Sequence, residues 1–300
     1  MRKNREIKVI FILLAVFFTV FLALPMIMVL GQSFTVDGQN GITFSNYAEH
    51  VRAVFEDNTL FGVYTNSLMV AVITALAGTL LSYGAALVTA RSTVSGKIKS
   101  AIESIAFVTN TIPGMVIGLA YLFAFTGTSL QNTFAILIIC NIVHFFSTPY
   151  LMMKNSLSKM NASWETTAML MGDNWIKTIM RVVTPNAIST LLEVFSYYFV
   201  NAMVTVSAVI FLAGARTMVI TTKIKELQYF NKYNEIFVLS LLILLTNLIG
   251  REEFQSYYPN ALYNGEETDA ANQSANPKVF PEKLTVDLLE KHQQLSEECK

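Results

Sequence analysis

The 300-residue sequence is poor in the side chains that most enzymes use for chemistry. It contains two cysteines, three histidines and only 14% charged residues. Cys140 lies inside an apolar run and Cys299 is next to the last residue, so no disulfide framework is expected. The phosphate-binding pattern G-x-x-x-x-G-K-[ST] and the zinc pattern H-E-x-x-H are both absent. We therefore expect no catalytic residue and no metal site in this chain.

Apolar residues, in contrast, make up 53% of the sequence and gather in long runs. A helix needs about 20 apolar residues to cross a bilayer core. Five runs reach that length, and a sixth, 236–249, is shorter. The five are 9–30, 66–90, 102–125, 134–153 and 187–213. The sequence predicts an all-α membrane protein with six transmembrane helices, the first of them retained and not cleaved as a signal peptide.

Basic residues near the ends of these runs predict the orientation, because Lys and Arg stay on the cytoplasmic side. Residues 1–8, 91–101 and 154–186 carry four, three and four of them, whereas 31–60 and 126–132 carry one and none. The remaining loop, 214–233, has four basic residues although it is expected outside. We follow the majority and expect both termini in the cytoplasm.

The charge balance changes near the end of the chain. Residues 1–250 carry 16 basic and 11 acidic residues, whereas 251–300 carry 5 basic and 10 acidic residues. The second segment is also polar and of low complexity, a composition typical of disordered chains. The sequence predicts a membrane domain at 1–250 and a disordered, acidic cytoplasmic tail at 251–300.

Two prolines interrupt the third and fourth apolar runs. Pro113 stands in TIPG and Pro149 in STPY. Since proline lacks an amide hydrogen and frees a backbone carbonyl, each predicts a kink.

Polar side chains inside the fourth and fifth runs fall on single helix faces. Glu193, Tyr197 and Asn201 recur every four residues, and Asn141 and His144 are three apart. Polar groups in hydrocarbon need a partner or an aqueous cavity. Two interpretations stay open: the residues line a translocation pathway, or they bond neighbouring helices together while the carboxylate reaches the near interface.

The segment 154–186 separates the fourth and fifth runs and contains WETTAMLMGDNWIKTIMRVVTP. Gly172, followed by Asp and Asn, predicts a turn between two short helices. Pro185 suits the start of the next helix. We expect a helix-turn-helix at the cytoplasmic face, and the two tryptophans also fit an interfacial anchor.

This stretch resembles the EAA loop, E-A-A-x-x-x-G-x9-I-x-L-P, of the permease subunits of binding-protein-dependent ABC importers. Aligning Gly172 and Pro185 with the motif puts its glutamate on Thr166 and its alanines on Thr167 and Ala168. Glu165 stands one place early, so either Glu165 or Thr166 takes the acidic position. YTNSLMVAVITAL and TIPGMVIGLAY are similar to the family's second and third spans.

The resemblance implies a permease subunit of the bacterial inner membrane that forms half of a solute pathway. It implies no cofactor in this chain, with ATP and Mg²⁺ held by a partner. The implied partners are a second permease subunit, two cytoplasmic ATPase subunits, an extracytoplasmic solute-binding protein and the lipid bilayer, without nucleic acid. The residues that would couple to the ATPase are Glu165, Thr166, Thr167, Ala168, Gly172 and Pro185.

Within that family the sequence is most similar in texture to the importers of 2-aminoethylphosphonate, iron(III) and polyamines. A small anion such as 2-aminoethylphosphonate is the preferred solute, because the basic loop 214–233 would attract anions. Iron(III) and polyamines are the alternatives. A secondary transporter, a channel and a non-transporting membrane scaffold also stay open.

Overall fold

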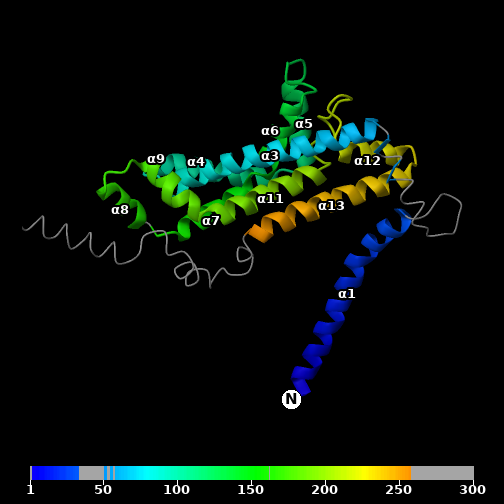
Figure 1. The fold of residues 1–300 in the computed structure, drawn as a ribbon, viewed down its shortest axis with the longest axis horizontal. Coiled ribbons are helices and arrows are strands. Elements are labelled where there is room, and N and C mark those ends of the chain that lie inside the picture. The colour runs from blue at the N-terminus through cyan, green and yellow to red at the C-terminus, as the bar shows by residue number, and fades with distance from the viewer. Residues whose placement is uncertain (1, 34–50, 53–54, 57, 162, 258–300) are drawn as a thin grey trace, which may run out of the picture.

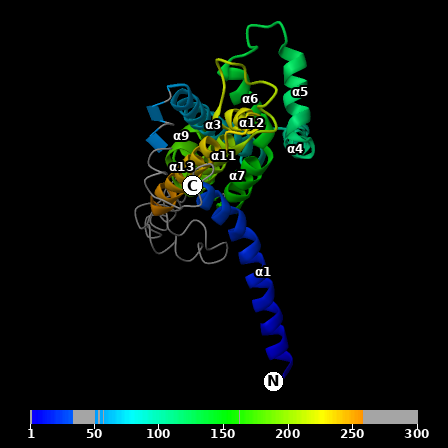
Figure 2. The same ribbon diagram turned by 90° about the vertical axis from the view of Figure 1, so that its right-hand side faces the viewer.

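The computed structural model describes residues 2–33, 51–52, 55–56, 58–161 and 163–257. All regular elements in these ranges are helices, which confirms the predicted all-α class. Figure 1 shows α11 lying between α3 and α13, and Figure 2 shows α1 projecting away from these helices. The principal helices are α1 (Arg2–Ser33), α3 (Asn58–Ala90), α4 (Gly96–Thr111), α5 (Gly114–Phe125), α6 (Phe134–Phe145), α7 (Ser147–Lys159), α8 (Ser163–Leu170), α9 (Trp175–Thr178), η1 (Ile179–Val183), α10 (Thr184–Asn186), α11 (Ile188–Val204), α12 (Ile220–Tyr229) and α13 (Tyr233–Tyr257).

Helix α3 is the centre of the bundle and packs along both α11 and α7. Its Gly78 lies against the ring of Tyr198, where an added Cβ would be 2.8 Å from ring carbons. One turn away, the hydroxyls of Tyr198 and Ser82 are 2.9 Å apart and share a hydrogen bond. A glycine at the contact thus lets a large, polar-tipped side chain fill the space between the two helices.

The predicted third and fourth spans are each broken into two helices. Helices α4 and α5 meet at 108°, and α6 and α7 meet at 56°. Ile112 before Pro113 is extended (φ −90°, ψ 123°), as expected because proline's ring disfavours a helical residue before it. Pro149 is the third residue of α7, one turn after the other bend. The two predicted kinks are confirmed, because the apolar runs 102–125 and 134–153 are each bent close to their proline.

The predicted fifth span, 187–213, is too long at its C-terminal end. Helix α11 stops at Val204, and Thr205 is extended (φ −68°, ψ 126°). The following residues turn back against α5 and α6, where Ala208, Val209 and Leu212 are buried. Hydrophobic burial is gained here by an irregular segment, so apolar character alone overestimated the helix.

The number of membrane crossings stays a prediction. Among the described residues one helix, Thr59–Ala90, is long and apolar enough to cross a bilayer, and up to four crossings result if each bent pair counts as one. Shorter apolar stretches occupy Ile10–Pro25 of α1 and Glu235–Gly250 of α13. Helix α13 itself continues to Tyr257, past the residues RE that follow the apolar stretch. Residues 251–257 of the predicted disordered tail are therefore helical, and the rest of that tail, 258–300, lies outside the described residues.

A predicted cytoplasmic loop, 154–186, and a predicted external loop, 214–233, contact opposite ends of α3. Arg91, directly after α3, contacts the segment that leads into α8. Near the start of α3, Ser67 accepts a hydrogen bond from the amide of Ile220 (2.6 Å), the first residue of α12. The basic loop 214–233 is therefore remote from segment 154–186 (Figure 1), which is the relative placement that the orientation argument requires.

Candidate coupling segment and translocation site

The segment between α7 and α11 contains the predicted helix-turn-helix. Helix α8 ends in a turn in which the amide of Asp173 donates to the carbonyl of Ala168 (3.0 Å). Gly172 is exposed and has φ +80°, and an added Cβ would meet nothing within 4 Å. This is the glycine-terminated helix end in which a left-handed residue closes the last turn. The backbone thus requires glycine here, although the space around it is open.

Helix α8 places the predicted motif residues on different sides. Thr166 is exposed, whereas Thr167 and Ala168 are half-buried. Glu165 faces the chain itself, and its carboxylate Oε1 is 3.7 Å from Nε of Arg91. Glu165, one of the two candidates for the acidic position of the motif, therefore already lies near a basic group of its own chain.

The second half of the segment is wound differently from an ordinary helix. Ile179–Val183 form a π-helical turn between α9 and α10. Thr184 donates to the carbonyl of Ile179 (2.9 Å), and its hydroxyl is 2.7 Å from that of Tyr83 on α3. Pro185 lies in the first turn of α10, as predicted for a helix start, and α11 follows after a 74° bend. The segment is therefore attached to α3 near each of its ends.

Exposed apolar side chains border the turn on both sides. Leu170, Met171, Ile176 and Met180 are each more than half exposed, and the two tryptophans, Trp164 and Trp175, are also exposed. Clustered exposed apolar residues mark protein or membrane contacts.

Two polar residues of α6, Asn141 and His144, have buried atoms without a hydrogen-bond partner in the described chain. Asn141 is 1% exposed, and neither of its amide atoms has a hydrogen-bond partner in the described chain. The buried Nδ1 of His144 also has none. A Cβ on Gly114 would lie 3.0 Å from Nε2 of His144 and 2.6 Å from Oγ of Ser207. Gly114 thus brings a histidine of α6 and a serine beyond α11 close together.

Sequence reasoning missed Ser207, because the residue was expected in a regular fifth span. The available signal was the glycine of TIPG, which allows close approach of another backbone or side chain.

The polar stripe of α11 is partly satisfied within its own helix. Asn201 donates from Nδ2 to the carbonyl of Tyr197 (2.8 Å), and Thr205 donates to the carbonyl of Asn201 (2.6 Å). The ring of Tyr197 packs edge-on against Phe145 of α6, with centroids 6.4 Å apart. Glu193 is half-buried and makes no hydrogen bond or ion pair with the residues that the structure describes. Tyr197 is therefore the stripe residue that reaches α6, next to His144.

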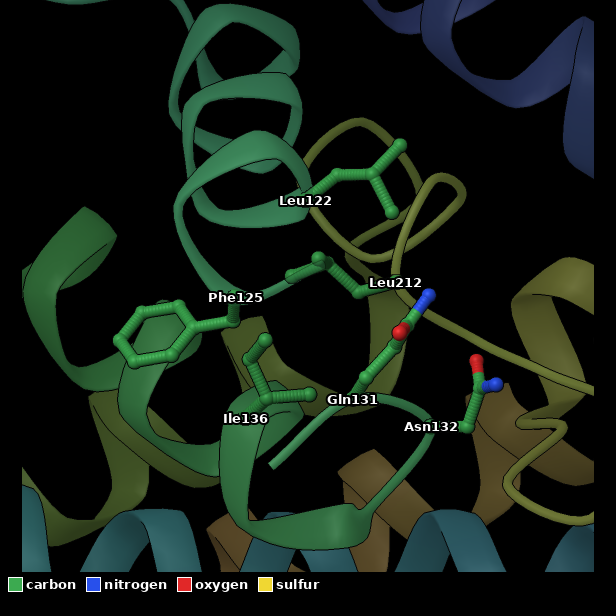
Figure 3. A pocket seen from close by; sticks show the side chains of 6 residues that line it. All are labelled: Leu122, Phe125, Gln131, Asn132, Ile136 and Leu212. Atoms are coloured by element: carbon green, nitrogen blue, oxygen red, sulfur yellow. The ribbon is translucent and has the colours of Figure 1, made fainter. Parts of the chain in front are cut away.

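A small pocket lies at the tip of the α5–α6 hairpin (Figure 3). Its apolar side chains come from α5, α6 and the segment after α11, and the amides of Gln131 and Asn132 stand to one side. The same two amides line a second, more open pocket with Ala215 and Arg216. Two of the predicted external loops, 126–132 and 214–233, therefore meet at this tip. Within the residues that the structure describes, no group of three or more His, Cys, Asp or Glu could hold a metal ion.

A known protein family matches more than half of this chain. The binding-protein-dependent transport system inner membrane components match residues 78–251. The matched range begins inside α3 and includes residues 160–186, α11 and most of α13.

Two curated relatives are named ferric transport system permease proteins. FbpB of Actinobacillus pleuropneumoniae is 28% identical over 188 residues, which are 61% of this chain and 26% of the relative. The putative FbpB 1 of Haemophilus influenzae is 30% identical over 195 residues, which are 62% of this chain and 30% of the relative. The chain thus spans less than a third of the length of either relative.

Solved bacterial transporters share the fold. A chain of an ABC transporter involved in the import of the acidic polysaccharide alginate superposes with a TM-score of 0.66 at 17% identity, covering 86% of this chain and all of that one. An alginate transporter in complex with an alginate pentasaccharide-bound periplasmic protein gives 0.70 at 16% identity, covering 85% of this chain and 94% of that one. At this identity the likeness establishes the fold alone.

Proposed function

The chain belongs to the family of binding-protein-dependent transport system inner membrane components, and on that premise we propose that it is the permease subunit of an ABC importer. The observation that carries the proposal is the surface of segment 160–186. It presents a glycine-closed turn and four exposed apolar side chains at one end of the bundle, all inside the matched range. In this role the chain carries no ATPase chemistry of its own.

The turn is the contact for a cytoplasmic ATPase. An apolar, protruding helix end fits a groove on a partner better than it fits water. The residues proposed to couple are Glu165, Thr166, Thr167, Ala168, Gly172 and Pro185. Of these, Gly172 is required by the turn itself. Thr166 is the exposed one of the two candidates for the acidic position of the motif.

The importer contains further chains. We assign to it a second permease subunit, two ATPase subunits and an extracytoplasmic solute-binding protein, with the bilayer around the helices. The alginate transporter in complex with its periplasmic protein supports the same kind of assembly by likeness of fold. The hairpin tip and residues 214–233, which lie away from the coupling turn, are the proposed side for the solute-binding protein.

The translocation route passes the polar residues between α6 and α11. Asn141 and His144 have buried polar atoms without a hydrogen-bond partner in the described chain, and Ser207 lies close to His144. Buried polar groups without partners are costly unless another state hydrates them. Glu193, Tyr197 and Asn201 continue the route along α11.

We propose iron(III) as the solute. The two relatives are named ferric transport permeases, which favours iron(III) among the alternatives. Nothing in these names supports the preference for 2-aminoethylphosphonate, and the exposed Arg216 at the tip pocket does not by itself select a small anion.

The test is uptake of ⁵⁵Fe(III), kept soluble with citrate, by cells with the gene deleted and then restored. Uptake should depend on the restored gene, fall with the phosphate mimic orthovanadate and persist with a protonophore. Uptake that fails with the protonophore but not with vanadate would identify a secondary transporter. Gene-dependent uptake of radiolabelled 2-aminoethylphosphonate without iron uptake would overturn the choice of solute while leaving the permease assignment in place.

A further inference from the structure

Arg91 holds both sides of the connection between α7 and α8. It directly follows α3, and its side chain is 6% exposed. Its Nη2 donates to the carbonyl of Met160 (2.7 Å), which follows the last residue of α7. Its Nε lies 3.7 Å from Oε1 of Glu165, in the first turn of α8. One guanidinium therefore touches the end of one helix and the start of the next.

The base of this side chain is fixed to α3. The amides of Arg91 and Ser92 both donate to the carbonyl of Leu87, at 2.9 and 3.1 Å. A planar guanidinium can serve two acceptors in different directions at once, whereas a lysine ammonium is a single point charge on a flexible stem. The geometry thus uses a property that only arginine supplies.

Arg91 and Glu165 form an ion pair but are too far apart for a hydrogen bond between Nε and Oε1. Neither Nε of Arg91 nor Oε1 of Glu165 has a hydrogen-bond partner in the described chain, although both atoms are buried. Charge-assisted hydrogen bonds between such groups are about 2.7–2.9 Å long, so the two atoms can approach by about 0.8 Å more. Helix α8 can therefore move relative to α3 while the two charges stay paired.

We propose that Arg91 is a positioning residue that transmits movement of α8 into α3. This inference rests on the proposed function, in which an ATPase moves α8. The chain itself links α8 to α7 and, through α9 and α10, to α11. Helix α3 packs along both of those helices but has no chain connection to the segment. Two polar contacts join the region of α3 to the segment: Arg91 contacts Met160 and Glu165, and Tyr83 contacts Thr184. The contact of Arg91 reaches α8.

A matched control is available at the same end of the bundle. Lys154 of α7 and Glu103 of α4 form an ion pair of 2.7 Å. This pair also joins two helices but does not touch residues 160–186. Lys154→Gln therefore removes an interhelical ion pair without disturbing the contact between α3 and α8.

The experiment compares Arg91→Gln, Arg91→Lys, Glu165→Gln, the double variant Arg91→Gln/Glu165→Gln and the control. Each tagged chain is purified with its ATPase, reconstituted in vesicles, and assayed for the stimulation of ATP hydrolysis by the cognate solute-binding protein. Arg91→Gln should copurify a normal amount of ATPase. The stimulation of its ATP hydrolysis should be about tenfold lower than in the unmodified chain, a change within the usual range of coupling between two sites. Arg91→Lys and Glu165→Gln should lose less. The double variant should be no worse than Arg91→Gln, because one contact is removed in both.

Three outcomes overturn the proposal. The first is stimulation of ATP hydrolysis in Arg91→Gln equal to that in Lys154→Gln. The others are additive losses of stimulation from the two single variants in the double variant, and failure of Arg91→Gln to copurify the ATPase. If Arg91→Gln does not accumulate in the membrane, the test depends on Arg91→Lys. Wild-type stimulation of ATP hydrolysis in Arg91→Lys rejects the proposed role of the two guanidinium contacts. Failure of the proposed function is distinguishable, since the unmodified chain would then copurify no ATPase in the first place.

Discussion

Two turns of this chain each contain a glycine with a positive φ but have different surfaces. Gly172 closes the coupling turn with φ +80°, and Gly127 opens the tip of the α5–α6 hairpin with φ +79°. At both positions an added Cβ would meet nothing within 4 Å. Around Gly172 the exposed neighbours are Leu170 and Met171, whereas Gly127 is followed by TSLQN, with Gln131 accepting a hydrogen bond from its amide (2.8 Å).

The comparison separates what a fold requires from what a partner requires. Both glycines satisfy the same backbone demand, so loss of either costs a similar strain of about 1–2 kcal/mol. Gly172 directly follows two exposed apolar side chains, Leu170 and Met171, as in a surface that another protein covers, whereas Gly127 lies between two exposed threonines, Thr126 and Thr128. Substitutions at the two turns should therefore have equal effects on folding and unequal effects on transport.

The largest expected difference between the two turns is the side of the membrane on which each one lies. Single cysteines at Lys159, just before the coupling segment, and at Lys225, in the loop near the hairpin tip, are introduced into a Cys140→Ser, Cys299→Ser background. An impermeant thiol reagent applied from outside should label Lys225→Cys and leave Lys159→Cys unlabelled until the cells are opened. External labelling at position 159 would reverse the assignment of the two turns.

Next comes replacement of each glycine by phenylalanine. Gly172→Phe should lower iron uptake and recovery of the ATPase by about tenfold, because a clash of about 1.4 kcal/mol at the interface adds to the strain. Gly127→Phe is the control, with the same backbone strain and little change in ATPase recovery. Equal ATPase recovery in both variants would mean that segment 160–186 is an interfacial anchor and not a docking site.

A smaller effect is expected on α11, which leads from the coupling segment toward the hairpin. Glu193→Gln should lower uptake several-fold at unchanged protein level, since the amide keeps the shape and removes the charge from the route. Asn201→Leu should act more mildly, because the amide of Asn201 already bonds within its own helix. Uptake at the wild-type level in Glu193→Gln would place that carboxylate at the membrane interface and outside the route.

The smallest effect on transport, and a clear one on stability, is expected within the hairpin. A Cβ on Gly118 would lie 2.2 Å from the carbonyl oxygen of Ala208, so Gly118→Ala should lower the free energy of unfolding by about 1–3 kcal/mol. Gly84→Ala in α3 is the control. Its Cβ would meet nothing within 4 Å, and alanine should stabilise the helix by about 0.5–1 kcal/mol. Thermal unfolding in detergent measures both, and equal shifts would contradict the close approach.

Local features of the sequence predicted much of this architecture. The helical class, the two proline bends and the turn at Gly172 each depend on residues within one or two turns of each other, where backbone chemistry decides. The helix-turn-helix of the coupling segment followed from the same rules.

Long-range packing was not predictable in this way. The angle of 108° at Ile112 and Pro113 depends on what α5 packs against, and the end of α11 depends on burial of Ala208 and Val209. The contact between Arg91 and Glu165 joins residues 74 positions apart, and no periodicity links them. A basic residue after one apolar run and an acidic residue in the coupling loop are ordinary features until the fold brings them together.

The close approach at Gly118 also limits how this protein can change over time. Every amino acid other than glycine carries an atom at the position that the Ala208 carbonyl already crowds, so every missense change of that codon starts from a steric conflict with main chain, which cannot rotate away as a side chain can. Selection for a new solute would therefore have to act on the side chains around this contact, while the contact itself is inherited unchanged.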